Sequence, residues 1–153
     1  TCRVFGKDYK LRLEKSQNNS VYIKDENLFI KLKDVDSIEE RKKHLDSFLR
    51  KILREKTELL IGKYEKEMEL KVSGFTIRKM KTKWGSCNID KKHININLDL
   101  VRNKIEALEY IVVHELCHLR EAGHGKKFYE LVEKYYPDYK RVEAYLDSQM
   151  ISG

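Results

Sequence analysis

The sequence has little glycine and proline, with 7 Gly and 1 Pro among 153 residues. This scarcity argues against a turn-rich all-β sandwich, a collagen-like chain and a low-complexity linker. The 3 Cys are an odd number without repeated spacing, which predicts no disulfide framework and a reducing, cytoplasmic location. No apolar run is long enough for a membrane span, so no membrane partner is expected. We therefore expect one compact domain, over residues 1–153, that is rich in helices.

Charge is abundant and mixed in sign. Lys and Arg number 32 against 25 Asp and Glu, which gives a net charge of +7. Because both signs are interspersed, a solvated surface accounts for most of these residues. A basic face that binds nucleic acid is compatible with the charge but is not required by it. Nothing in the sequence assigns an oligomeric state.

Residues 1–35 alternate between apolar and polar side chains, which is typical of strands with one buried face. Polar turns separate three such runs, so the sequence predicts an antiparallel β-meander. A long amphipathic helix and its connection are expected over residues 36–73. Ser37 and Glu40 form a capping box at its start, and the helix should run from Ile38 into the mid-sixties.

Residues 74–153 are expected to form the remaining part of the domain. Strand patterns cover Phe75 to Lys83 and His93 to Leu98, and a turn is expected between them. Asn103 should cap a strongly apolar helix, and a third helix is predicted from Lys126 to Tyr136. A last amphipathic stretch follows Pro137. The fold class is therefore α+β, with a small antiparallel or mixed β layer packed on helices.

The apolar helix contains the pattern H-E-x-x-H at His114, Glu115 and His118. At about 100° per residue, His118 lies about 40° around the helix from His114, so both imidazoles can hold one metal ion. Zinc in a catalytic site takes three protein ligands and keeps one position for water. Glu115 lies on the same sector of the helix, beside such a water, as a general base would.

His124 follows His118 by six residues and is the predicted third ligand. A straight helix would turn His124 away from His114 and His118, so the helix must end first. Gly123 and Gly125 flank His124 and can adopt the left-handed conformation that ends helices. A carboxylate could instead complete the set, as in sites with two histidines and one glutamate. The candidates for that role are Glu130, Glu133 and Glu143.

Three segments together resemble the YgjP-like metallopeptidase family. They are Arg78–Cys87, which ends in Trp-Gly-Ser-Cys, the strand Ile94–Asn97, and the helix around His114–Leu119 with His124. The resemblance covers Phe75 to about Leu146, including Phe128 and Tyr136–Tyr139. It implies a minimal zincin-like metallopeptidase with a central H-E-x-x-H helix, one zinc ion per chain and a peptide or protein substrate.

These residues predict hydrolysis by a metal-activated water, with Glu115 taking its proton. The same residues would also support hydrolysis of a non-peptide amide or ester. A zinc site that only stabilises the fold is disfavoured, because it would close with four protein ligands and would have no use for Glu115. A DNA-associated protease domain is a further alternative, since Trp84 follows a basic stretch and could contact nucleic acid. Arg78, Lys79, Lys81 and Lys83 form that stretch.

Substrate residues are predicted around the strand from His93 to Leu98. An extended peptide could pair with this strand if it is a sheet edge beside the metal. The predicted substrate-binding residues are Trp84, His93, Asn95, Asn97 and Tyr129. The oxyanion of the tetrahedral intermediate needs a donor, for which the candidates are Tyr129, Tyr135, Tyr136, Arg120 and Lys126. Cys117 is expected to be a buried thiol, whereas Cys87 either packs at the turn or lies near the site.

Overall fold

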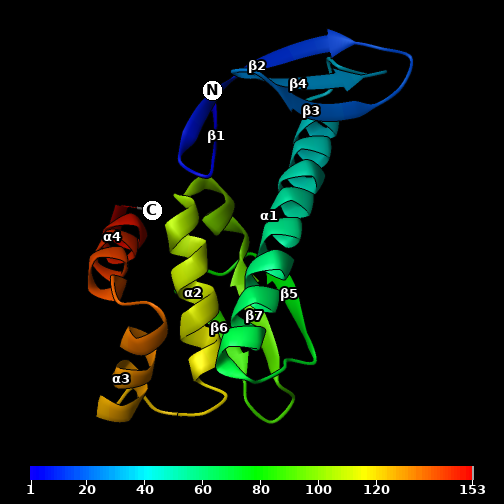
Figure 1. The fold of residues 1–153 in the computed structure, drawn as a ribbon. Helices are drawn as coiled ribbons and strands as arrows, with labels where there is room; N and C mark the ends of the chain where they lie inside the picture. Colours follow the sequence, from blue (N-terminus) through cyan, green and yellow to red (C-terminus); the bar gives the residue numbers. More distant parts are fainter. Residues whose placement is uncertain (153) are drawn as a thin grey trace.

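A computed structural model describes residues 1–152 of the chain and confirms the α+β class (Figure 1). Two small sheets are joined by one long helix, and three further helices follow the second sheet. The elements are β1 (Cys2–Val4), β2 (Lys7–Lys15), β3 (Ser20–Lys24), β4 (Asn27–Leu32), α1 (Ile38–Met68), β5 (Gly74–Arg78), β6 (Gly85–Asn88), β7 (His93–Asn97), the 3-10 helix η1 (Leu98–Arg102), α2 (Ile105–Cys117), α3 (Lys126–Tyr135) and α4 (Tyr139–Ser152). Among residues 1–152, no helix is long and apolar enough to cross a membrane.

The N-terminal sheet is not the β-meander that the alternation predicted. Its strand order is β1-β2-β4-β3, and β2 pairs with β4 in parallel. β4 is one of the two inner strands, and its apolar residues Leu28, Ile30 and Leu32 are almost fully buried. By contrast, Leu11 and Leu13 of β2 remain 38% and 44% exposed. In Figure 1 this sheet lies across the N-terminal end of α1.

Helix α1 begins as predicted. The Ser37 side chain accepts a hydrogen bond from the backbone N–H of Glu40 at 3.2 Å. The helix ends at Met68, where Glu69 takes the left-handed conformation. Its buried residues face the core, and the rest of its surface carries the mixed charges. The helix thereby connects the N-terminal sheet with the second sheet and α2.

The second sheet has the order β5-β7-β6. β7 is its central strand, with β5 parallel on one side and β6 antiparallel on the other. The expectation that a peptide adds to the strand from His93 is therefore wrong, because both of its edges are already paired. The segment after Trp84, predicted as a turn, forms the edge strand β6. The first strand ends at Arg78 and does not extend to Lys83.

Helix α2 is the central helix of the second half, and most of its side chains are buried. Lys104 precedes it without a side-chain cap, so the prediction that Asn103 caps α2 is wrong. Asn103 instead donates to the carbonyl of Asp99 and accepts a hydrogen bond from Tyr145. Cys117 is fully buried, as predicted. α3 ends at Tyr135, one residue before the predicted end.

Candidate metal centre

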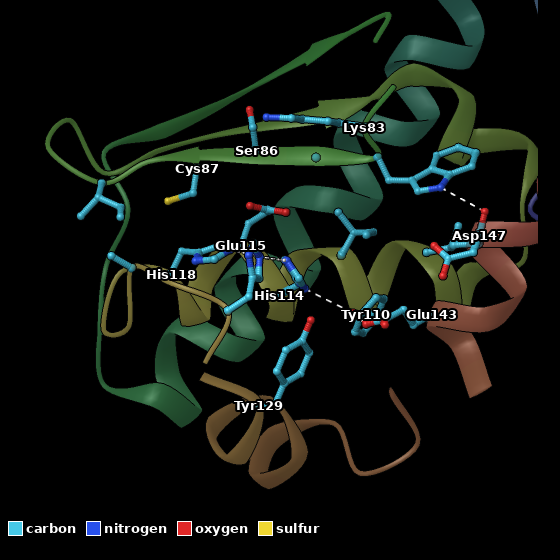
Figure 2. Close-up of a pocket in the computed structure, with 17 residues that line it drawn as sticks. Lys83, Ser86, Cys87, Tyr110, His114, Glu115, His118, Tyr129, Glu143 and Asp147 are labelled. Carbon is cyan, nitrogen blue, oxygen red and sulfur yellow. Dashed lines mark hydrogen bonds between the residues drawn. The ribbon is translucent and has the colours of Figure 1, made fainter. Parts of the chain in front are cut away.

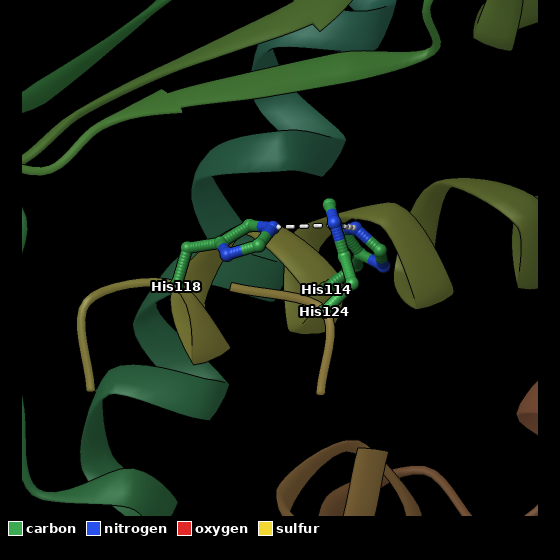
Figure 3. A group of neighbouring side chains, drawn as sticks. All are labelled: His114, His118 and His124. Atoms are coloured by element: carbon green, nitrogen blue, oxygen red, sulfur yellow. Dashed lines mark hydrogen bonds between the residues drawn. The ribbon is translucent and has the colours of Figure 1, made fainter. Parts of the chain in front are cut away.

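The three predicted histidines converge at the C-terminal end of α2 (Figure 3). His114 lies on the last turn of α2, His118 follows the helix directly, and His124 approaches from the loop before α3. The Nε2 atom of His124 lies 3.0 Å from Nε2 of His118 and 3.3 Å from Nε2 of His114. This is the only such group of potential metal ligands found among the described residues.

The loop that returns His124 to the helix is built differently from the prediction. The helix ends at Cys117, and the amides of Leu119 and Arg120 bond three residues back, to Leu116 and Cys117. This tighter turn ends the helix well before the glycines. Neither Gly123 nor Gly125 has a positive φ, so the prediction that a left-handed glycine reverses the chain is wrong.

The donor atoms fit a zinc ion. Tetrahedral zinc with Zn–N bonds of about 2.0–2.1 Å separates its nitrogen ligands by about 3.3–3.4 Å. The two separations of 3.0 and 3.3 Å agree with this spacing. Three ligating histidines would leave one coordination position for water or substrate. The residues present therefore suit a catalytic zinc site.

Hydrogen bonds hold two of the imidazoles in the tautomer that a metal requires. Tyr110 donates its hydroxyl to Glu143 Oε2 at 2.6 Å, so its oxygen accepts from Nδ1–H of His114 at 3.2 Å. His118 donates from Nδ1 to the carbonyl of Glu121 at 3.1 Å. In both rings the proton is therefore on Nδ1, and the Nε2 lone pair faces the cluster.

Burial also keeps His114 and His118 neutral. The pKa of His114 is lowered to about 4, first by burial and then by the neighbouring charges of His118 and His124. Burial likewise lowers the pKa of His118. Neutral imidazoles can bind a cation without first losing a proton, so these two ligands are ready for metal at neutral pH.

Glu115 lies next to the histidines and points toward β6, in the pocket shown in Figure 2. It is only 4% exposed, and burial raises its pKa to about 8, although the nearby Lys83 opposes this shift. A carboxyl group with a pKa near neutrality suits a group that takes and returns a proton. Its position inside the pocket agrees with the role predicted from the motif.

Gly85 allows β6 to approach α2 closely at this point. A Cβ atom on Gly85 would lie 2.8 Å from Ile111 Cγ2 and 3.3 Å from Glu115 Cγ. Because such contacts are too close, a larger residue would push the strand away from the helix. The glycine of the Trp-Gly-Ser-Cys segment thus sets the distance between Glu115 and the sheet edge.

The burial of Glu115 makes the metal-free protein sensitive to pH. Its pKa is about 8 in the folded protein, whereas the ordinary value is 4.5. The folded protein holds this proton more tightly than the unfolded chain does, so protonated Glu115 contributes fully to the free energy of unfolding below pH 4.5. This contribution is lost as the pH rises through 8. His114, with a lowered pKa of about 4 against an ordinary value of 6.5, acts in the opposite direction, and most of its effect lies below pH 6.5.

Between pH 6.5 and pH 8 we therefore expect the free energy of unfolding to fall by about 1–2 kcal/mol. Urea titrations of the metal-free protein at several pH values measure this decrease. The decrease should vanish in Glu115→Gln and persist in Glu133→Gln, which changes an exposed carboxylate on α3. A decrease of equal size in Glu115→Gln would contradict the assignment.

The pocket around the histidines has a volume of about 480 Å³. Of the predicted substrate residues, it includes Trp84 and Tyr129 but not His93, Asn95 or Asn97. His93 bonds to Thr76, and Asn95 donates to Ser86. Asn97 is buried, and its amide donates to the carbonyls of Met80 and Lys83. Asn95 and Asn97 therefore support the strand and loop that border the pocket, whereas His93 joins β7 to β5.

Trp84 and Cys87 form part of the pocket wall on the β6 side. The Trp84 indole N–H donates to the carbonyl of Leu146 at 3.2 Å, which ties the start of β6 to α4. Cys87 lies in β6, where burial and the charge of Glu115 raise the pKa of its thiol to about 11. The thiol is therefore protonated at neutral pH and is not a nucleophile.

Tyr129 is the candidate oxyanion donor that lines the pocket. Figure 2 shows its hydroxyl pointing toward the histidines, and burial raises its pKa, so the hydroxyl keeps its proton. Tyr136 donates instead to the carbonyl of Glu106, and Arg120 donates to the carbonyl of Met68. Neither Tyr135 nor Lys126 lines this pocket.

Sequence reasoning missed the pair formed by Tyr110 and Glu143. Tyr110 lies four residues before His114, so the two share one face of α2, and this spacing was a usable signal. Glu143 was considered as a metal ligand, but its carboxylate instead accepts the hydrogen bond from Tyr110. Glu130 and Glu133 are exposed on α3 and lie outside the histidine group.

Comparisons with known proteins return metallopeptidases. The YgjP-like metallopeptidase domain family matches residues 1–149. Crystal structures of two metallopeptidase zymogens share the fold. Abylysin of Pyrococcus abyssi has a TM-score of 0.56 and 22% identity, covering 61% of this chain and 93% of its own. Jannalysin of Methanocaldococcus jannaschii has a TM-score of 0.54 and 24% identity, and the match covers 61% of this chain and 96% of jannalysin. The comparison with curated proteins found no match.

Proposed function

The chain belongs to the YgjP-like metallopeptidase family, and we propose that it cleaves peptide bonds with one zinc ion held by His114, His118 and His124 and with Glu115 as general base. One observation carries this proposal. Three imidazole nitrogens converge at zinc-like spacing beside a buried carboxyl group, inside a pocket that is open to solvent. A site that only stabilised the fold would have no use for the carboxyl group.

When bound, zinc would supply a Lewis acid that lowers the pKa of water and polarises a carbonyl. In this proposal Glu115 accepts the proton of the attacking water and later gives it to the leaving amine. Burial raises the pKa of Glu115 to about 8 in the metal-free protein, which makes its carboxylate a stronger base and leaves its acid form able to return the proton. Tyr129 would donate a hydrogen bond to the oxygen on which negative charge develops.

The free edge of β6 could bind an extended peptide substrate. β6 is the outer strand of its sheet, and Gly85, Ser86 and Cys87 line the pocket. A peptide that adds to this edge would gain backbone hydrogen bonds and would pass beside Glu115. In this proposal β6 takes the role that the sequence had given to the strand from His93.

Removal and return of metal test the proposed cofactor. Hydrolysis of a peptide substrate should stop after chelation and return in full at one equivalent of zinc per chain. Activity that survives complete removal of metal would contradict the proposal, and so would zinc binding without any effect on hydrolysis.

Tyr110→Phe should weaken zinc binding about 10–100-fold, because the phenolic oxygen that orients His114 is lost. Competition with a chromophoric chelator measures the affinity. Tyr64→Phe is the matched control, since it removes a buried hydroxyl on α1. Equal zinc affinity in Tyr110→Phe and Tyr64→Phe would show that Tyr110 does not orient the ligand.

A further inference from the structure

The N-terminal sheet has one face that packs on the core and one that does not. The inner face carries the apolar residues of β3 and β4 that pack toward α1. The opposite side, which we call the outer face, carries every second residue of three paired strands. Its members are Lys10, Arg12 and Glu14 of β2, Ser20, Tyr22 and Lys24 of β3, and Asn27, Phe29 and Lys31 of β4.

Two aromatic rings lie at the centre of the outer face. The strand register puts Arg12, Phe29 and Tyr22 in one row across three strands. The rings of Tyr22 and Phe29 stack, with centroids 5.1 Å apart and planes 20° apart. Both residues remain partly exposed, although the fold does not need aromatic side chains on this side of the sheet. They form a stacked aromatic pair that is partly exposed to solvent, so the ring surface not covered by the pair remains available for stacking.

Positive charge surrounds these rings. The ammonium group of Lys31 lies 5.2 Å from the Tyr22 centroid and 5.7 Å from that of Phe29. Arg12 donates to Asn27 at 2.8 Å, which holds the guanidinium along the sheet. Lys10 and Lys24 are exposed on either side of Asn27. The single acidic member, Glu14, lies 3.5 Å from Lys31, and the acidic turn 25–26 borders one end of the face.

We propose that the outer face binds single-stranded nucleic acid. Bases would stack on Tyr22 and Phe29, while Lys10, Arg12, Lys24 and Lys31 would meet the phosphates. The bases of a duplex are stacked on one another, so their faces cannot reach the exposed rings. An acidic peptide would need the positive charges but would have no use for the stacked rings. Stacking on aromatic side chains accepts any base, so binding would have little sequence preference.

This surface is separate from the candidate zinc site. In Figure 1 the sheet lies at one end of the molecule, and the C-terminal end of α2, with its histidines, lies at the other. Neither zinc nor Glu115 contributes to the outer face. Nucleic acid binding would therefore persist in the metal-free protein, and its loss would leave cleavage of a short peptide unchanged.

Fluorescence anisotropy of labelled oligothymidylate with the full chain tests the proposal. Tyr22→Leu keeps apolar bulk but removes the ring, and it should weaken binding at least about fivefold, whereas Tyr22→Phe should bind like the wild type. The double variant Lys10→Gln with Lys24→Gln should show a weaker dependence of binding on salt. The slope of log affinity against log salt concentration should fall by about 0.7 for each phosphate that a lysine no longer neutralises. The matched pair Lys66→Gln with Lys140→Gln changes two exposed lysines elsewhere and should alter neither value.

Circular dichroism and thermal unfolding check that each variant remains folded. Weaker binding in folded Tyr22→Leu, together with unchanged binding in Tyr22→Phe, supports stacking on this face. The proposal is overturned if the wild type does not bind single strands at low salt, or if duplex DNA binds equally well. It is also overturned if polyglutamate competes as well as unlabelled oligothymidylate, since the partner would then be an acidic protein.

Discussion

Glu115→Gln is expected to lower the rate of peptide hydrolysis about 10²–10⁴-fold, which is the range that general acid–base catalysis contributes. Gln has nearly the same shape as Glu, so the buried position beside β6 remains filled. It cannot accept a proton from water, however, so the attacking water stays a weak nucleophile. The histidines should still bind zinc, because Glu115 is not among the clustered ligands.

Two measurements on one sample separate catalysis from metal binding in this variant. Zinc content by mass spectrometry should equal that of the wild type, while turnover of a peptide substrate should be lost. Glu133→Gln, which changes an exposed carboxylate on α3, should keep both properties. Turnover near the wild-type rate in zinc-loaded Glu115→Gln would remove Glu115 from the mechanism.

The second large effect is expected from His118→Ala, which should abolish both zinc retention and hydrolysis. His118 contributes one of three nitrogens, and the remaining two would leave zinc with weaker and incomplete coordination. The loss should exceed the effect of Tyr110→Phe, because a ligand is removed and not merely its hydrogen-bonding partner. Zinc content after dialysis against a weak chelator measures the loss.

His93→Ala is the matched control for that experiment. His93 bonds to Thr76 on the second sheet and does not belong to the histidine cluster. It should retain one zinc ion per chain and should hydrolyse peptide at a rate close to that of the wild type. If His118→Ala kept its zinc, the metal would have to lie elsewhere in the chain, and the proposed site would be wrong.

The local parts of the site were predictable because helix geometry alone relates them. His114, Glu115 and His118 lie within five positions of one helix, where periodicity determines which side chains share a face. His124 followed from its spacing and from the chemical need for a third ligand. Cys117 was predicted to be buried because helix geometry places it about 300° around from His114, away from the metal site, and its side chain is fully buried.

The non-local parts were not predictable from pattern alone. Alternation shows which side of a strand is apolar but not which strand lies next to it, so the parallel β2–β4 pair was missed. The same reason explains why the strand from His93 was taken for an edge, although β6 lies beyond it. The hydrogen bond from Tyr110 to Glu143 joins residues 33 positions apart, which no local spacing indicates.

Cleavage of a peptide library tests the central claim most directly. Zinc-loaded wild-type protein and zinc-loaded Glu115→Gln are incubated with the same library, and new peptide termini are identified by mass spectrometry. The proposed mechanism predicts new termini with the wild type and none with Glu115→Gln at equal zinc content. New termini in equal number with both proteins, or with neither, would contradict it.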